Sequence, residues 1–168
     1  IIDDLLLLSK ADTRKIKLDV EEVSLRDLIL DVCMDMKVVA DKKNVELEAN
    51  ELEDIRLKGD ELKLRRMLLN IVENAIKYSH AGGRVRVSSH ANNGYAIIYV
   101  KDNGIGISEM DIKYIFDRFY RADRSRKRAS GSGLGLSISR WIAEAHQGGI
   151  EVESQPAQGS MFTIKLPI

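Results

Sequence analysis

Three long stretches of the chain carry apolar residues at every third or fourth position, which is the spacing of one face of an α-helix. Two of them follow residues that can cap a helix, Ser24 and Asp60. Their apolar positions are Leu25, Leu28, Ile29, Val32, Met36 and Val39, and then Leu64, Met67, Leu68, Ile71, Val72 and Ala75. The third stretch runs from about 136 to 146 and stops at Gly148. This pattern predicts three amphipathic helices.

Shorter segments alternate between apolar and polar residues or are rich in β-branched residues, as strands are. They are residues 16–23, 45–49, 55–59, 84–90, 95–100, 149–154 and 160–166. The turn residues Asn92, Asn93 and Gly94 predict a hairpin between two of these strands. A capping box of Ser108 and Asp111 predicts a short helix that ends near Phe116. Because strands and helices do not alternate regularly, the expected fold class is α+β rather than a parallel doubly wound sheet.

The first residues of the chain differ from the rest. Ile1, Ile2, Leu5 and Leu8 belong to an apolar surface that is too wide for an isolated helix. We expect residues 1–11 to be the last turns of a helix that packs on a partner. The opening segment IIDDLLLLSKAD has no initiator methionine, which suggests a piece of a longer protein.

Composition narrows the possible classes of protein. Of the 168 residues, 44% are hydrophobic and 31% are charged, which favours one compact domain over disorder. The 26 basic and 26 acidic residues cancel, so no overall charge indicates nucleic acid or an anionic membrane as partner. Cys33 is the single cysteine, which excludes an intramolecular disulfide. No apolar run approaches the roughly 18 residues of a membrane-spanning helix, so we expect a soluble domain.

A polar stripe lies on the second long helix. Asn70, Asn74, Lys77 and Tyr78 are spaced so that they share one edge beside the apolar face. Amide oxygens suit a hard cation such as Mg²⁺, which takes few ligands from protein and keeps water and phosphate oxygens. Lys77 could then neutralise phosphate charge. The alternative is an ordinary solvated flank of the helix.

A glycine cluster precedes the third long helix in the segment GSGLGLSIS, residues 131–139. Glycines allow backbone N–H groups to approach an anion, and a helix N-terminus adds partial positive charge. The spacing matches neither the dinucleotide-binding motif nor the P-loop. A phosphate site is the more specific interpretation, and an ordinary flexible loop is the alternative.

An arginine-rich segment, IFDRFYRADRSRKR (115–128), interleaves arginines with Phe116, Phe119 and Tyr120. It could be a lid that is hinged on its aromatics and brings an arginine to a terminal phosphate. Its aromatics could instead anchor in the core and leave the arginines solvated, or the patch could bind single-stranded nucleic acid. One short patch in a neutral chain supports the last possibility weakly.

An acid stands directly after a predicted strand in the segment DNGIGIS, residues 102–108. A carboxylate held in a pocket accepts a hydrogen bond from an exocyclic amine such as N6 of adenine. Guanine would present a carbonyl oxygen at that position. Asp102 is therefore the candidate reader of adenine.

Five segments, taken in order, resemble the ATP-binding domain of bacterial sensor histidine kinases. They are NIVENAIKY (70–78), DNGIGI (102–107), IFDRFYR (115–121), GSGLGLSI (131–138) and GSMFTIKLP (159–167), which look like the N box, first glycine box, F box, second glycine box and closing strand. The resemblance places the chain in the GHKL ATPase superfamily. It implies a two-layer sandwich in which three helices cover one face of a mixed, mostly antiparallel sheet. Residues 1–12 are similar to the end of the family's dimerisation hairpin, which leaves 13–168 as the catalytic domain.

The resemblance also implies roles for individual residues and two cofactors, ATP and Mg²⁺. The metal ligand would be Asn74, assisted by Asn70. The catalytic residues would be Asn70, Lys77, Arg118 and Arg121. The nucleotide would be bound by Asn74, Tyr78, Asp102, Gly104, Gly106, Ile107, Gly131, Ser132, Gly133, Leu134, Gly135 and Leu136. Ser132 stands where the family often has threonine, which keeps the hydroxyl.

One position indicates the branch of the superfamily. Gyrase-like and chaperone ATPases place a glutamate where this chain has Asn70, and an amide is a poor general base. We therefore expect slow hydrolysis and transfer of the γ-phosphoryl group to a histidine. His80, His90 and His146 are expected to be ordinary surface histidines rather than that acceptor. The alternative function is a self-contained GHKL ATPase or an anti-sigma-type serine kinase.

The expected partners follow from the same resemblance. They are the histidine-bearing dimerisation domain of the same protein and a downstream response regulator, with no nucleic acid. The chain itself would be a monomer. Its expected location is the cytoplasmic side of a membrane-anchored sensor kinase.

Overall fold

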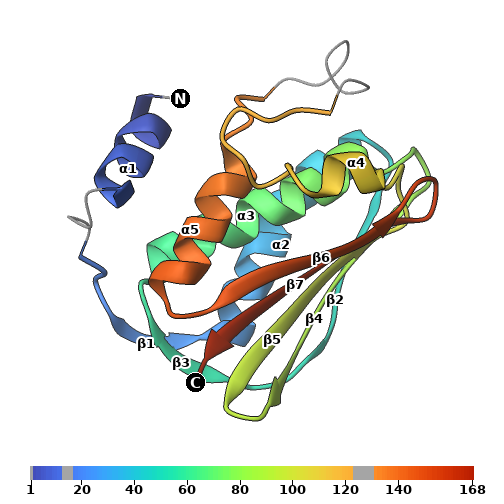
Figure 1. Ribbon diagram of the computed structural model, residues 1–168. Coiled ribbons are helices and arrows are strands. Elements are labelled where there is room, and N and C mark those ends of the chain that lie inside the picture. The colour runs from blue at the N-terminus through green and yellow to red at the C-terminus, as the bar shows by residue number, and fades with distance from the viewer. Residues whose placement is uncertain (1, 13–16, 123–130) are drawn as a thin grey trace.

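The computed structural model describes residues 2–12, 17–122 and 131–168, and the statements below concern those residues. In chain order the elements are α1 (Ile2–Asp12), β1 (Glu21–Ser24), α2 (Leu25–Lys42), β2 (Glu46–Leu52), β3 (Arg56–Gly59), α3 (Glu61–Tyr78), β4 (Arg84–Asn92), β5 (Tyr95–Asp102), α4 (Glu109–Ile112), α5 (Gly135–Ala145), β6 (Gly149–Gln155) and β7 (Gly159–Pro167). Figure 1 follows them along the chain.

The main sheet has the strand order β2-β4-β5-β7-β6. Its β2 and β4 strands pair in parallel, whereas the other three neighbouring pairs are antiparallel. The hairpin between β4 and β5 turns at Asn93 and Gly94, whose φ angles of 50° and 80° suit asparagine and glycine. The predicted α+β class and the mixed, mostly antiparallel sheet are confirmed. A separate two-stranded sheet of β1 and β3 was not predicted.

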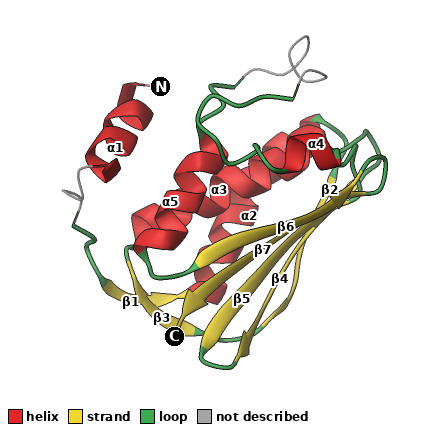
Figure 2. Cartoon of the chain, viewed as in Figure 1, coloured by secondary structure: helices red, strands yellow, loops and turns green. Residues whose placement is uncertain are grey.

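Helices α2, α3 and α5 cover one face of the main sheet (Figure 2). Helix α3 lies in the middle and contacts both α2 and α5. Every second residue of the three central strands points at these helices, and this alternation builds the core. The buried strand residues include Val85, Val87, Ala96, Ile98, Val100, Phe162, Ile164 and Leu166. The expectation of three helices on one face is confirmed.

Three predicted helix starts have the expected caps. The side chains of Ser24, Asp60 and Ser108 each accept a hydrogen bond from the backbone N–H three residues later. Such a bond satisfies one of the N–H groups that the first helical turn leaves unpaired. Local sequence therefore sets where these helices begin.

Several predicted boundaries were wrong. Residues 17–20, predicted as part of a strand from 16 to 23, are not in a strand; β1 starts at Glu21, and the N–H of Asp19 bonds the carboxylate of Asp60 (3.1 Å). Residue 16 lies outside the described residues. Helix α4 ends at Ile112, and the residues up to Phe116 form turns. Val39, predicted on the apolar face of α2, is 44% exposed.

His146 is more than the surface residue that its position at the end of α5 suggested. Its Nε2 accepts the N–H of Asp60 (2.9 Å), and its Nδ1 lies 2.7 Å from the carbonyl of Ile142. One ring nitrogen therefore accepts and the other donates, as in the neutral imidazole. His146 ties the end of α5 to the start of α3. His90 is half-buried and stacks on Tyr99, whereas His80 is exposed.

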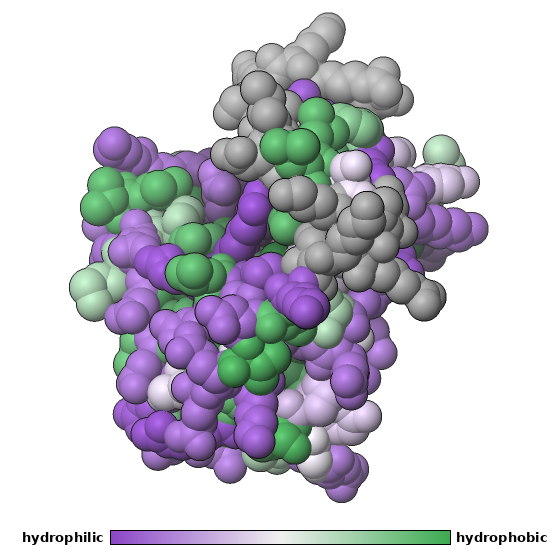
Figure 3. All heavy atoms as spheres, turned by 90° about the vertical axis from the view of Figure 1, so that its left-hand side faces the viewer, coloured by the Kyte–Doolittle hydropathy of each residue, from purple (hydrophilic) through white to green (hydrophobic). Residues whose placement is uncertain are grey.

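Helix α1 packs beside α5 through few contacts. Leu8 is buried, and Asp4 forms an ion pair with Arg66 of α3. Leu5 and Leu6 remain exposed. The face that includes α1 is mostly hydrophilic, with separate apolar patches (Figure 3). Among the described helices, none has both the length and the apolar character needed to cross a membrane.

Candidate functional site

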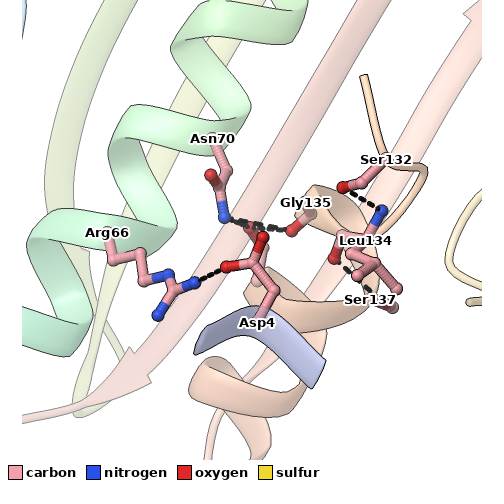
Figure 4. Close-up of polar contacts among 8 residues, drawn as sticks. Asp4, Arg66, Asn70, Ser132, Leu134, Gly135 and Ser137 are labelled. Atoms are coloured by element: carbon pink, nitrogen blue, oxygen red, sulfur yellow. Dashed lines mark hydrogen bonds and ion pairs between the residues drawn. The ribbon is translucent and has the colours of Figure 1, made fainter. Parts of the chain in front are cut away.

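The polar stripe of α3 faces the start of α5. The Nδ2 atom of Asn70 donates to the carbonyl oxygen of Gly135 (3.1 Å) and lies 3.4 Å from the hydroxyl of Ser139. Figure 4 shows Asn70 of α3 pointing at Gly135 of α5, and it also draws the ion pair between Asp4 and Arg66. The structure therefore brings the predicted N box and second glycine box together, 65 residues apart in the chain.

Two further residues of the stripe lie toward the end of α3. Asn74 is half-buried, and its amide has no hydrogen-bond partner within the described ranges. The ammonium group of Lys77 lies 5.3 Å from the ring centroid of Tyr78. A Cβ built on Gly131 would lie 3.1 Å from that ammonium nitrogen. An amide and an ammonium group thus lie on the helical edge that approaches the glycine cluster.

The N-terminus of α5 has no side-chain cap. Its N-cap residue is Leu134, and its first turn contains no acid, whereas Ser24, Asp60 and Ser108 cap α2, α3 and α4. The hydroxyl of Ser132 accepts the N–H of Leu134 (3.3 Å) and leaves the first helical turn open. Backbone N–H groups and the helix dipole at this end are suited to an anion.

Gly133 joins the glycine cluster to the F box. Its φ is 72°, and a Cβ there would lie 2.9 Å from the backbone of Phe119. Its carbonyl also accepts the N–H of Phe119 (2.9 Å). Only glycine fits this contact without displacing backbone. The turn before α5 is therefore fixed by the neighbouring segment as well as by its own sequence.

Asp102 ends β5 with a side chain that is only 4% exposed. Its Oδ1 accepts the N–H of Gly104 (2.9 Å), and the backbone N–H of Ser160 also bonds the carboxylate. Burial raises the pKa of Asp102 above its ordinary value, and the two N–H bonds offset only part of that effect. This carboxyl group is desolvated and has no cation paired with it among the described residues.

The first glycine loop is wedged between α3 and the end of β6. A Cβ on Gly104 would lie 2.2 Å from the carbonyl oxygen of Tyr78, and one on Gly106 would lie 1.9 Å from that of Gln155. Gly106 also has a φ of 68°. The N–H of Ile107 donates to the hydroxyl of Ser154 (2.8 Å). Glycine is therefore required at both 104 and 106. The close contact of Gly104 with Tyr78 places Asp102 near the end of α3.

A hollow of about 480 Å³ opens at the end of the sheet beside Asp102. Ile112, Ser154 and Ser160 are among the residues that line it. Sequence reasoning missed the two serines as site residues, although Ser160 lies in the closing-strand segment. Their hydroxyl oxygens are 2.8 Å apart. They extend the polar surroundings of Asp102 across β6 and β7.

The F box is only partly anchored in the core. The ring of Phe116 packs edge-on against Phe162 with centroids 6.4 Å apart, whereas Phe119 is 59% exposed. The hydroxyl of Tyr120 donates to Asp111 (2.5 Å). Arg118 is exposed, Arg121 is half-buried, and both make contacts. The remaining arginines of the predicted lid, at 124, 126 and 128, lie outside the described residues.

Other types of catalytic centre find little support. The described residues contain no group of three or more His, Cys, Asp or Glu side chains that could hold a metal. Burial raises the pKa of the Cys33 thiol to about 11, which opposes a nucleophilic role at neutral pH.

Comparison with known proteins agrees with this geometry. Residues 59–168 match the family of histidine kinase-, DNA gyrase B-, and HSP90-like ATPases, and the chain belongs to that family. Within the family it is the ATP-binding catalytic domain of sensor histidine kinases, because its relatives of that class align along its whole length.

Three relatives illustrate this. The sensor histidine kinase RppB of Synechocystis sp. is 39% identical over 170 residues, which cover 100% of this chain and 37% of RppB. The histidine kinase AdeS of Acinetobacter baumannii has a TM-score of 0.82 at 26% identity and covers 99% of this chain and 76% of the AdeS chain. Full-length ShkA, solved in complex with AMPPNP, has a TM-score of 0.88 at 27% identity, over 99% of this chain and 35% of ShkA. The chain thus corresponds to a minor part of RppB.

Proposed function

We propose that this chain binds Mg-ATP and donates its γ-phosphoryl group to a histidine on the dimerisation domain of the same protein. Two features together carry the proposal: the buried carboxyl group of Asp102, which has no cation partner among the described residues, and the uncapped N-terminus of α5. The α3 stripe connects the two. One feature suits a base with an exocyclic amine, and the other suits phosphate. The solved complex of ShkA with AMPPNP supports this proposal.

Adenine recognition is assigned to Asp102. Its carboxylate would accept the N6 amine in a charge-assisted hydrogen bond, whereas guanine would bring a carbonyl oxygen against it. Tyr78 and Ile107 flank the glycine loop and would contact the nucleotide. Gly104 and Gly106 keep this loop close to α3 and β6, which would seat the base beside Asp102.

Magnesium fits Asn74, which lies toward the end of α3, and Asn70, which lies one turn before it. Asn74 carries an amide without a partner in the described ranges, and amide oxygens are ligands that Mg²⁺ accepts. Asn74 would be the protein ligand, and the oxygen of Asn70 is the atom that could assist. When bound, the cation would neutralise charge on the phosphate oxygens.

The phosphates are assigned to the glycine cluster. The N–H groups of residues 131–136 and the α5 N-terminus would bind them, and Lys77 lies close enough to Gly131 to add positive charge. Arg118 or Arg121 would approach the γ-phosphate from the F box. Phosphoryl transfer depends mainly on positioning and charge neutralisation, and these groups supply both.

Transfer is favoured over hydrolysis because no described side chain of the stripe can activate water well. Asn70 is an amide, and its nitrogen is bonded to α5. His146 has both ring nitrogens engaged, so it is not the acceptor. The acceptor would come from the dimerisation domain, and a response regulator would receive the group next. We expect the whole protein to place this domain in the cytoplasm.

Thermal unfolding with Mg-ATP, Mg-GTP and no nucleotide tests the binding step. Mg-ATP at about a hundredfold its Kd should stabilise the chain by about 2.7 kcal/mol. A shift as large with Mg-GTP would contradict the role of Asp102. To test transfer, the chain is mixed with a dimerisation domain that carries the acceptor histidine. Labelled phosphate should appear on that domain, whereas rapid ATP turnover without it would favour the ATPase alternative.

A further inference from the structure

The contact between Asn70 and the start of α5 indicates a role that differs from metal binding. We propose that Asn70 is a positioning residue for the nucleotide, and that the buried hydroxyl of Ser139 is its partner. Together they fix the first turn of α5 against α3. The inference rests on the proposed function, since it concerns how the phosphate-binding end is held at a set distance from Asn74.

The contact is a small network between two helices. The Nδ2 atom of Asn70 lies 3.1 Å from the carbonyl oxygen of Gly135 and 3.4 Å from the hydroxyl of Ser139. Ser139 is fully buried, and its hydroxyl donates to the carbonyl of Gly135 (2.9 Å) or of Met67 (3.4 Å). Ser139 and Gly135 both belong to α5 and Met67 belongs to α3, so the contact with Met67 links the same two helices as Asn70 does.

The surroundings decide which way the Asn70 amide faces. The carbonyl of Gly135 can only accept, and the proton of Ser139 is already directed at a carbonyl. Both neighbours therefore offer lone pairs, and the NH₂ group of Asn70 must point at α5. A side chain without an NH₂ donor would leave this contact unmade. The contact thus needs the nitrogen of Asn70, whereas a metal ligand would need the oxygen.

Gly135 is the residue at which this contact matters for the nucleotide. It is the first residue of α5 and directly follows Leu134, which provides no side-chain cap. The serines on either side, Ser132 and Ser137, bond Leu134 within the same segment and do not reach α3 through those bonds. The bond from Asn70 fixes the first turn of α5 against α3, so the backbone N–H groups of that turn keep one direction. Without this bond, the N–H groups of the first turn would take several directions, and phosphate binding would weaken.

The test compares nucleotide affinity with and without Mg²⁺. In Asn70→Ala, ATP binding should weaken by about tenfold, the loss of one well-placed hydrogen bond, and by the same factor in excess EDTA. Asn70→Asp keeps an oxygen ligand but lacks the NH₂ group, so it should not restore binding. The proposal would be overturned by a loss seen only with Mg²⁺, or by Asp restoring Mg-ATP affinity.

A double-mutant cycle tests the partner. Ser139→Ala should weaken ATP binding by about twofold to threefold alone and add almost nothing to Asn70→Ala, because the two side chains act on one turn. Ser137→Ala is the matched control, since it removes a hydroxyl of the same helix that bonds only Leu134. Full additivity of Asn70→Ala and Ser139→Ala would contradict the proposal. Unfolding temperatures without nucleotide show whether each variant is folded.

The outcomes also separate the two proposals. If the unaltered chain fails to bind ATP at all, the proposed function is wrong. If it binds ATP and prefers it to GTP, but Asn70→Ala loses affinity only with Mg²⁺, the function stands and the positioning role does not.

Discussion

Asp60 lies at the start of helix α3, and Asp102 lies near its end. Their carboxyl groups are almost equally buried but have different surroundings. Asp60 is 3% exposed and Asp102 is 4% exposed. Burial by itself would raise the pKa of both. The pKa of Asp60 is nevertheless lowered, whereas that of Asp102 is raised. The difference lies in the groups that surround each one.

Asp60 has a complete set of partners. Its carboxylate caps α3 through the N–H of Lys63 (3.1 Å), accepts the N–H of Asp19 (3.1 Å) and pairs with the Lys63 ammonium group. These bonds outweigh the cost of burial and favour the ionised form. The backbone N–H of the same residue is accepted by His146. The carboxylate and the backbone N–H of Asp60 are thus both satisfied by groups of the chain.

Asp102 receives backbone N–H bonds from Gly104 and Ser160, and among the described residues no cation is paired with it. At the same end, Asn74 lacks a described partner and α5 lacks a cap. A buried polar group that is not fully paired costs stability. The Asp60 end therefore stabilises the fold, whereas the Asp102 end leaves hydrogen-bonding groups available for the proposed nucleotide.

The largest effect is expected for Asp102→Asn. Loss of the charge-assisted bond to the adenine amine should weaken Mg-ATP binding by about tenfold to a hundredfold. The preference for ATP over GTP should fall with it. Titration of each nucleotide measures both quantities. Asp60→Asn is the matched control, because it alters an equally buried carboxyl group at the other end and should leave ATP affinity within about twofold. Equal losses of ATP affinity in Asp102→Asn and Asp60→Asn would contradict the different roles assigned to the two carboxyl groups.

A smaller effect, on stability, is expected for Asp60→Ala. Removal of the cap and of the bonds to Asp19 and Lys63 should cost about 1 to 2 kcal/mol of unfolding free energy. For a chain of this size that corresponds to roughly 2 to 8 °C in Tm. Thermal unfolding without nucleotide measures it. Asp102→Ala should not reproduce this loss, since its carboxyl group carries a cost of burial. An unchanged Tm in Asp60→Ala would show that its bonds contribute little.

The smallest effect concerns pH. The pKa of Asp60 is lowered in the folded chain, so its contribution is present above the unfolded value of about 4 and is lost as pH falls through the folded value. The pKa of Asp102 is raised, so its carboxyl group opposes folding increasingly as pH rises through the window between the unfolded and folded values.

The two asparagine variants should therefore show opposite trends when their Tm is compared with that of the unaltered chain from about pH 2 to 7, with the change for Asp60→Asn mainly below about pH 4 and the change for Asp102→Asn mainly above it. Asp60→Asn should become relatively less stable as pH rises, and Asp102→Asn relatively more stable. Differential scanning calorimetry across this range measures both trends. Parallel trends would mean that the two sites do not differ in the way described.

Local signals made most of the fold predictable. The helices α2 and α3 begin after Ser24 and Asp60 because each cap acts within three residues of chain. The β4–β5 hairpin follows from Asn93 and Gly94, whose positive φ angles suit that turn. The predicted start of β1 was wrong. In the segment before β1, the N–H of Asp19 bonds the carboxylate of Asp60, which is 41 residues away in the sequence. No local pattern contains that bond.

The candidate site was predictable in its residue types and less so in its contacts. The spacing of Asn70, Asn74 and Lys77 placed them on one helical edge, since helical geometry fixes that relation. Their approach to the glycine cluster depended on how α3 and α5 pack. Ser139, Ser154 and Ser160 were missed because an isolated serine gives no signal of its surroundings. Their roles arise from neighbours on other strands and helices.

Short segments of the sequence are enough to predict the order of elements, the helix caps, the positions of the glycines and the family of this chain. The packing of distant segments gives Asp60 a cation partner and Asp102 none among the described residues, and it turns the nitrogen of Asn70 toward α5. The physical reason is that burial and hydrogen bonding depend on groups brought together from distant parts of the chain. The same amide or carboxyl group can stabilise the fold or serve a ligand, and its neighbours decide which.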